Sequence, residues 1–172
     1  MVQTSPGAIV PTTTGRHHAV RHRPCRRRVA APRRVDALLA HYGESHRDPR
    51  NEAIHCVAIP LILLSLLGLM AALHPWVAYA FVAASLVYYA RLSGVFLASM
   101  ALVSLLALAL VHAMGERVLP LSAGIFVAAW IAQFVGHKLE GRKPSFFEDL
   151  QYLWVGPLFV LSLLFRKLGL RW

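Results

Sequence analysis

The sequence is short of charge and of cysteine, and both deficits limit what the protein can be. Only 15% of its 172 residues are charged and 57% are hydrophobic, which is too apolar for a soluble globular domain of this size. Its two cysteines, Cys25 and Cys56, lie far apart in segments of different composition, which excludes a disulfide framework and a thiolate metal site. The composition therefore favours a single membrane-embedded domain.

Acidic residues are absent from the first 34 residues, which contain eight arginines. These arginines carry most of the net charge of +10, because the other 138 residues are nearly balanced, at +2. The segment is rich in threonine, proline and arginine and has no helical apolar period, so we predict a disordered tail over 1–34. A basic block of this kind favours a role in membrane topology over nucleic-acid binding, and we expect no specific nucleic-acid partner.

The rest of the chain, 35–172, alternates apolar runs with short polar connections. Residues 35–47 place apolar side chains at helical spacing and predict a short amphipathic helix. Asp48 and Pro49 are typical of a cap and a first helical position, and so predict the start of the next helix. Four apolar runs predict four membrane spans, although the second is short: 56–73, 75–90, 92–114 and 118–136.

A fifth apolar run, 150–165, is short and interrupted by Gly156-Pro157, so we expect it to lie in the interface or to re-enter the membrane. The fold class expected from these runs is all-α, a polytopic membrane helical bundle. The positive-inside rule places the Arg-rich N-terminus in the cytoplasm. We expect a bacterial inner membrane, or the endoplasmic reticulum in a eukaryote.

Four crossings bring two polar groups to the same side of the membrane. His46 and His55 enter the first span on the side where His137 and Glu140 leave the fourth. Asn51 shares a helix face with His55, because the two residues are four apart. Imidazole and carboxylate groups suit Fe, Zn or Mn, so we predict a metal site at this surface.

Other polar residues lie close to the same surface. His41 and Gln133 are candidates to support the ligands from outside the coordination sphere. Arg142 and Lys143 are candidates to bind a substrate carboxylate, and a role as anchors for lipid phosphate is equally consistent with their position.

Two stretches in this order resemble a known family. They read Tyr42-x-x-x-His46-x-x-Pro49-x-Asn51-x-x-x-His55 and Trp130-x-x-Gln133-Phe134-x-Gly136-His137-x-x-Glu140, and Gly156-Pro157-Leu158-Phe159 follows. The pattern resembles the yeast-type 2-hydroxy fatty acid dioxygenase family, whose name refers to the metabolism of phytosphingosine to odd-numbered fatty acids. The resemblance covers about 35–168.

The resemblance implies an Fe(II)-dependent enzyme embedded in a membrane. Such an enzyme uses O2 to remove the carboxyl carbon from a long-chain 2-hydroxy fatty acid, leaving an acid one carbon shorter. His46, His55 and His137 are the positions that carry over as iron ligands. Asn51 and Glu140 are also motif positions, and we expect them to orient a ligand imidazole or to accept the hydroxyl proton as catalytic residues.

Two other interpretations compete with this one. A di-iron lipid hydroxylase is also apolar and rich in histidine, but it uses several histidine clusters, and only six histidines lie outside the tail. A non-enzymatic multi-pass membrane protein or lipid-binding protein would use the same histidines as structural hydrogen-bonding groups. The number of iron ions per chain separates the first alternative from the dioxygenase, and the absence of a metal would indicate the second.

Overall fold

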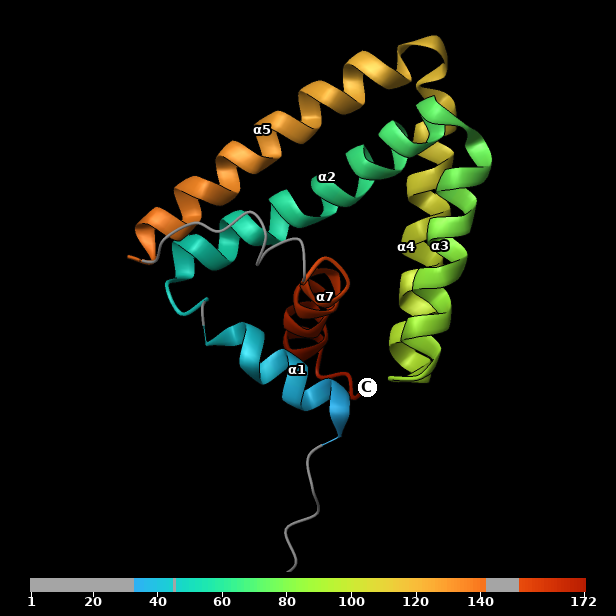
Figure 1. The fold of residues 1–172 in the computed structure, drawn as a ribbon. Coiled ribbons are helices and arrows are strands. Elements are labelled where there is room, and N and C mark those ends of the chain that lie inside the picture. Colours follow the sequence, from blue (N-terminus) through green and yellow to red (C-terminus); the bar gives the residue numbers. More distant parts are fainter. Residues whose placement is uncertain (1–32, 45, 142–151) are drawn as a thin grey trace, which may run out of the picture. The chain divides into compact units, whose positions relative to one another are not determined.

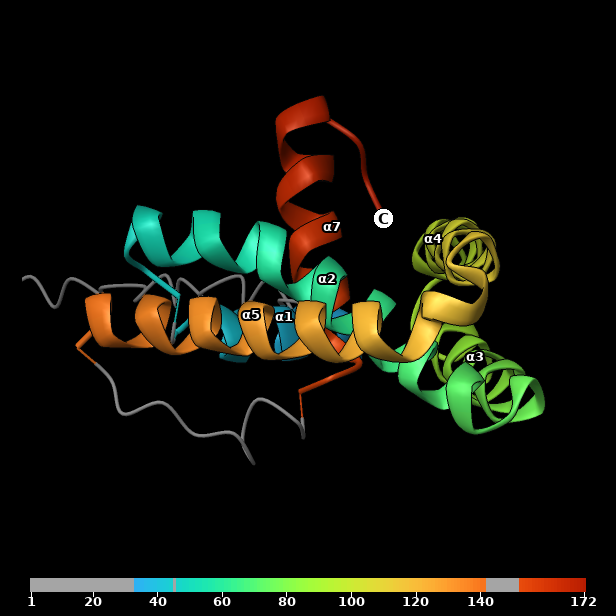
Figure 2. The ribbon, with the colours of Figure 1, turned by 90° about the horizontal axis from the view of Figure 1, so that it is seen from above.

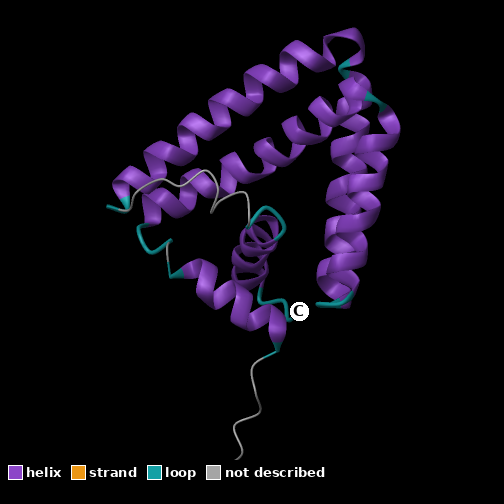
Figure 3. Cartoon of the chain, viewed as in Figure 1, coloured by secondary structure: helices purple, strands orange, loops and turns teal. Residues whose placement is uncertain are grey.

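The computed structural model describes residues 33–44, 46–141 and 152–172. These described residues belong to one compact unit. The described part of the chain contains helices and no strands (Figure 3). The helices are α1 (Arg34–Gly43), α2 (Pro49–Leu73), α3 (Pro75–Ala90), α4 (Gly94–Ala113), the short 3-10 helix η1 (Gly115–Arg117), α5 (Val118–Leu139) and α7 (Val155–Leu168).

Three of these helical segments are long and apolar enough to cross a membrane: α2, α4 and the continuous stretch Gly115–Leu139. The prediction of an all-α membrane helical bundle is confirmed. Helix α3 has 16 residues and is apolar but shorter than the other three, as the length of its apolar run suggested. Helix α7 has 14 residues and packs against α1 and α2, so the fifth apolar run forms a short helix from Val155 onward.

Helices α2 and α5 run side by side, and theirs is the most extensive contact between any two elements of the unit (Figures 1 and 2). Helices α3 and α4 form a second pair, and both also contact α2. The main hydrophobic core joins apolar side chains of α1, α2, α4 and α7, among them Val35, Leu67, Phe96 and Leu158, all of which are fully buried. This core fixes α1 and α7 against α2.

The start of α2 follows the predicted pattern. Asp48 is the N-cap, its carboxylate accepts a hydrogen bond from the backbone N–H of Arg50 at 2.8 Å, and Pro49 is the first helical residue. The predicted end of the amphipathic helix was wrong, because α1 ends at Gly43 and not at residue 47. Glycine favours the end of a helix, and the N–H of His46 bonds back to the carbonyl of Gly43 at 3.2 Å. The chain therefore turns back toward α2 at this point.

Two glycines allow α2 and α5 to approach closely. A Cβ atom on Gly68 of α2 would overlap the hydroxyl of Ser122 and lie 3.0 Å from its Cβ. A Cβ atom on Gly136 of α5 would overlap the side-chain oxygen of Asn51. Small residues at helix contacts let backbones approach where no hydrophobic force drives association, which is the usual situation inside a membrane.

We expect Gly68→Ala and Gly136→Ala each to destabilise the fold by about 1–3 kcal/mol, because both insert a methyl group into a filled contact. Gly124→Ala is the matched control, since a Cβ at this position of α5 meets nothing within 4 Å. Thermal unfolding of the purified variants checks this. Equal unfolding temperatures for all three variants would show that the α2–α5 contact does not limit stability.

Candidate metal centre

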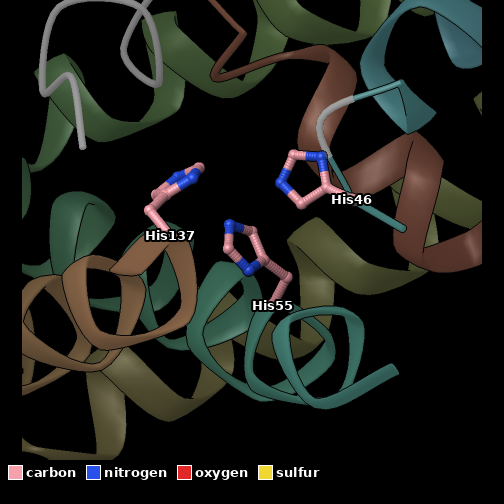
Figure 4. Close-up of side chains that lie close together, drawn as sticks. All are labelled: His46, His55 and His137. Carbon is pink, nitrogen blue, oxygen red and sulfur yellow. The ribbon is translucent and has the colours of Figure 1, made fainter. Parts of the chain in front are cut away.

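Three histidines from three different segments meet in the structure (Figure 4). His46 lies in the connection between α1 and α2, His55 on the second turn of α2, and His137 in the last turn of α5. One ring nitrogen from each lies within 4.8 Å of the others, and all three residues are buried, with at most 6% exposed. In the described residues this is the one group of three or more such side chains that has the geometry to hold a metal ion.

The protonation of two of these rings is fixed by the backbone. Nδ1 of His46 lies 2.8 Å from the carbonyl oxygen of Tyr42, and Nδ1 of His55 lies 2.9 Å from that of Asn51. A carbonyl oxygen only accepts, so each Nδ1 carries the proton and donates it. The lone pair of each neutral ring is therefore on Nε2, and this is the arrangement that outer partners impose on metal-binding histidines.

Aromatic rings hold His46 in place. The ring of Tyr42, in the last turn of α1, stacks on it with centroids 4.3 Å apart and planes at 13°. Phe159 of α7 packs against it at 5.5 Å. His55 also packs against this imidazole, nearly perpendicular to it, at a centroid distance of 4.3 Å. Helices α1 and α7 therefore position a residue that belongs to neither of them.

Glu140, which follows α5, ties the segment that carries His46 to the end of that helix. One carboxylate oxygen accepts the backbone N–H of Arg47 at 2.9 Å, and the other accepts the N–H of Asp48, also at 2.9 Å. The second oxygen also accepts the side-chain N–H of Asn51 at 3.1 Å. In a capping box, a residue of the same helix bonds the N-cap N–H. Here the N–H of Asp48, the N-cap of α2, is bonded by Glu140, which follows α5.

These donors set the charge of Glu140. Burial alone raises the pKa of its carboxyl, but the hydrogen bonds from the N–H groups of Asp48 and Arg47 and from the amide of Asn51 outweigh it, and the pKa is lowered. The stabilisation from this carboxylate is therefore fully present above the ordinary pKa of a glutamate. It is lost as the pH falls through the lower value of the folded state.

Asn51 forms hydrogen bonds with both His55 and Glu140. It is fully buried, its backbone carbonyl orients His55, and its amide nitrogen donates to Glu140. Its amide oxygen lies where a Cβ atom of residue 136 would be, so glycine at that position makes room for it. The structure thus places Asn51 and Glu140 beside the three histidines: Asn51 bonds the ring of His55 and the Glu140 carboxylate, and that carboxylate also bonds the backbone of residues 47 and 48.

The other predicted residues are placed differently. Gln133 is buried on α5, one turn before His137. His41 is exposed, its Nδ1 lies 3.7 Å from a carboxylate oxygen of Glu44, and it is outside the group of three histidines. Arg142 and Lys143, the predicted substrate-binding pair, lie outside the described residues.

Comparison with known proteins now adds to this geometry. Residues 33–168 match the family described as 2-hydroxy-palmitic acid dioxygenase Mpo1-like. The chain belongs to this Mpo1-like family. Among curated members, it is 30% identical to the 2-hydroxy-palmitic acid dioxygenase MPO1 of Saccharomyces cerevisiae over 138 residues, which is 76% of this chain and 79% of the yeast protein. No solved structure matches the chain.

Sequence reasoning about the Mpo1-like pattern missed the roles of two aromatic residues. Tyr42 and Phe159 stood in the quoted motifs, and the structure shows that both pack on His46. The spacing of four between Tyr42 and His46 was the available signal for the first contact. No pattern in the sequence could have predicted the contacts of Glu140. Its carboxylate bonds backbone N–H groups, and these occur at every residue other than proline.

We expect Glu140→Gln to destabilise the protein by about 1–3 kcal/mol and to weaken metal binding, because the amide presents an N–H to backbone N–H groups. Glu44→Gln is the matched control. Glu44 lies in the connection between α1 and α2 that Glu140 contacts, but its carboxylate is exposed and lies near His41. Thermal unfolding and metal content measured on each variant check this. If Glu140→Gln retained both properties at the level of Glu44→Gln, the carboxylate would not hold the segment in place.

Proposed function

We propose that the protein is an Fe(II)-dependent dioxygenase that shortens long-chain 2-hydroxy fatty acids by one carbon at the membrane interface. The observation that carries the proposal is the meeting of three buried imidazoles, with ligand atoms within 4.8 Å of one another, in a member of the Mpo1-like family. The name of the yeast relative describes a dioxygenase acting on 2-hydroxy-palmitic acid.

The donor set fits ferrous iron. Imidazole is a good ligand for iron, and three protein ligands leave coordination positions open for substrate and O2. Nδ1–H of His46 and of His55 each faces a backbone carbonyl, which leaves the Nε2 lone pairs for the metal. When bound, Fe(II) supplies the activation of O2 that amino-acid side chains do not provide.

The residues of the chain would hold and shield this centre. Tyr42 and Phe159 cover His46 with aromatic surface, and the burial of all three histidines keeps bulk water away from the ligand atoms. Asn51 orients His55 through its carbonyl, and Glu140 keeps the segment with His46 against α2 and α5. The histidines stand at the start of α2 and the end of α5, which suits a substrate with a polar head and a long apolar tail.

The proposed topology is multi-pass, with the N-terminus in the cytoplasm, in a bacterial inner membrane or, in a eukaryote, the endoplasmic reticulum. Exposed basic residues stand near the start of α2, at the end of α5, between α3 and α4, and at the end of α7: Arg47, Arg50, Lys138, Arg91, Arg166, Lys167 and Arg171. The opposite helix ends, at His74 and at Glu116-Arg117, carry one arginine and one glutamate. This asymmetry supports a cytoplasmic face that includes the three histidines.

The two competing interpretations make different demands on the described residues. A di-iron hydroxylase needs ligands for a second ion, and the described residues contain no second group of three. In a non-enzymatic membrane protein the histidines would be structural. Three neutral imidazoles gathered in a buried position are costly in that role, because each polar nitrogen must then be satisfied by another group.

We expect the purified protein to bind about one iron per chain and to convert 2-hydroxy-palmitic acid to the acid with one carbon less. His55→Ala and His137→Ala should each lower iron content and turnover roughly a hundredfold or more, because each removes a ligand and leaves a cavity. His112→Ala is the matched control, since this exposed histidine lies near the end of α4.

Iron content by elemental analysis and the product by mass spectrometry provide the measurements. Full turnover in either variant would remove the assignment of the site. Two iron ions per chain would support the di-iron alternative. Loss of stability in the histidine variants without any bound metal in the parent protein would support the structural one.

A further inference from the structure

A small cavity lies close to the three histidines, beside the residues of α2 that follow His55 and the residues of α5 that precede His137. It has a volume of about 30 Å³. Among the residues that line it are Tyr42, Ile59, Ile62, Leu63, Gln133 and Leu153, together with further aromatic side chains. The ring of Tyr42 stacks on His46, Ile59 follows His55 by one turn, and Gln133 precedes His137 by one turn. One neighbour of each of the three histidines therefore lines the cavity.

The side-chain oxygen of Gln133 is the group in this cavity that requires a hydrogen-bond donor. The residue is 3% exposed, and its side-chain oxygen is buried and accepts no hydrogen bond from the residues that the structure describes. Leaving a buried polar atom in this state destabilises a protein, and such atoms are rare in folded proteins. The neighbouring wall is apolar and includes Ile62, Leu63 and Leu153. The cavity thus combines a mostly apolar wall with the buried hydrogen-bond acceptor of Gln133.

We propose that Gln133 accepts a hydrogen bond from the 2-hydroxyl group of the substrate and thereby selects 2-hydroxy acids over unsubstituted ones. This inference rests on the proposed function. An ionised carboxylate only accepts hydrogen bonds and an alkyl chain makes none. The hydroxyl O–H is therefore the single donor on a 2-hydroxy acid, and it matches a buried acceptor. An unsubstituted acid, and equally a 2-oxo acid, would leave the oxygen of Gln133 without a donor.

The position of Gln133 suits this role. Residues four apart on a helix have Cβ atoms about 5–6 Å apart on one face, so the carboxamide lies one turn from the imidazole of His137. The cavity is large enough for a hydroxyl-sized group and too small for a long alkyl chain. A site built to bond a substrate hydroxyl discriminates strongly, because an analogue without that group leaves a buried polar atom unsatisfied.

The test compares the binding of two acids to the full-length protein in lipid nanodiscs, as purified and without oxygen, so that no acid is consumed. The quantity measured is the ratio of the dissociation constants of palmitic acid and 2-hydroxy-palmitic acid. In the parent protein 2-hydroxy-palmitic acid should bind more tightly. Gln133→Met, which keeps the length of the side chain and removes the acceptor, should weaken its binding by about fivefold to tenfold. The affinity for palmitic acid should stay the same.

Two further variants make the result specific. Leu63→Met is the matched control, because it introduces the same side chain at another position of the cavity wall and should leave the ratio unchanged. Gln133→Asn keeps the amide and withdraws it by one carbon, so it should lower the ratio even if Gln133→Met folds poorly. Metal content should be the same in all variants.

The proposal is overturned if Gln133→Met weakens the binding of both acids equally, which would mean that the amide binds the carboxylate. It is also overturned if Gln133→Met changes neither affinity, which would assign the cavity to a water molecule. A loss of metal on substitution of Gln133 would mean that this residue positions the histidines, and would also overturn the proposal. Failure of the proposed function appears separately, as a parent protein without iron or turnover. In that case a ratio that still depends on Gln133 would leave a binding site selective for 2-hydroxy acids.

Discussion

The close contact between the first turns of α2 and the last turn of α5 is the constraint on which the candidate site depends. Gly136 lets the amide of Asn51 lie against α5, and Glu140 reaches across to the backbone of residues 47 and 48. These contacts bring His55 and His137 together and fold the chain back so that His46 completes the group. Ligands separated by more than eighty residues therefore depend on one helix crossing.

The chemistry of the group follows from its location in a membrane protein. Charged side chains are costly to bury, whereas neutral imidazoles hydrogen-bonded to carbonyl oxygens are much less so. Three neutral rings do not neutralise the charge of a divalent cation that they bind. Under the proposed function an anionic head group is therefore favoured at the site, which agrees with a carboxylic acid as substrate. Glu140 is the nearby carboxylate, and backbone N–H groups occupy both of its oxygens.

Much of this arrangement was predictable from the sequence, because membrane spans are long and their ends alternate sides. The cap at Asp48, the proline after it and the apolar runs placed the helices. Counting crossings predicted that His55 and His137 lie near each other, and the structure places ring nitrogens of the two within 4.8 Å. The end of α1 and the contacts of Glu140 were not predictable, since both depend on how a short connection folds onto neighbouring helices. The prediction of a substrate-binding role for Arg142 and Lys143 stays a prediction, because both residues lie outside the described part of the chain.

The most direct test of the central claim, that one ion is bound by three imidazoles from three segments, is X-ray absorption at the iron edge of the loaded protein. The account predicts a first shell with three imidazole nitrogens, recognisable by the outer scattering of their rings. It also predicts the loss of one ring in His46→Ala, the ligand that only the folded connection supplies. An iron environment of oxygen ligands without imidazole scattering, or an unchanged spectrum in His46→Ala, would contradict it.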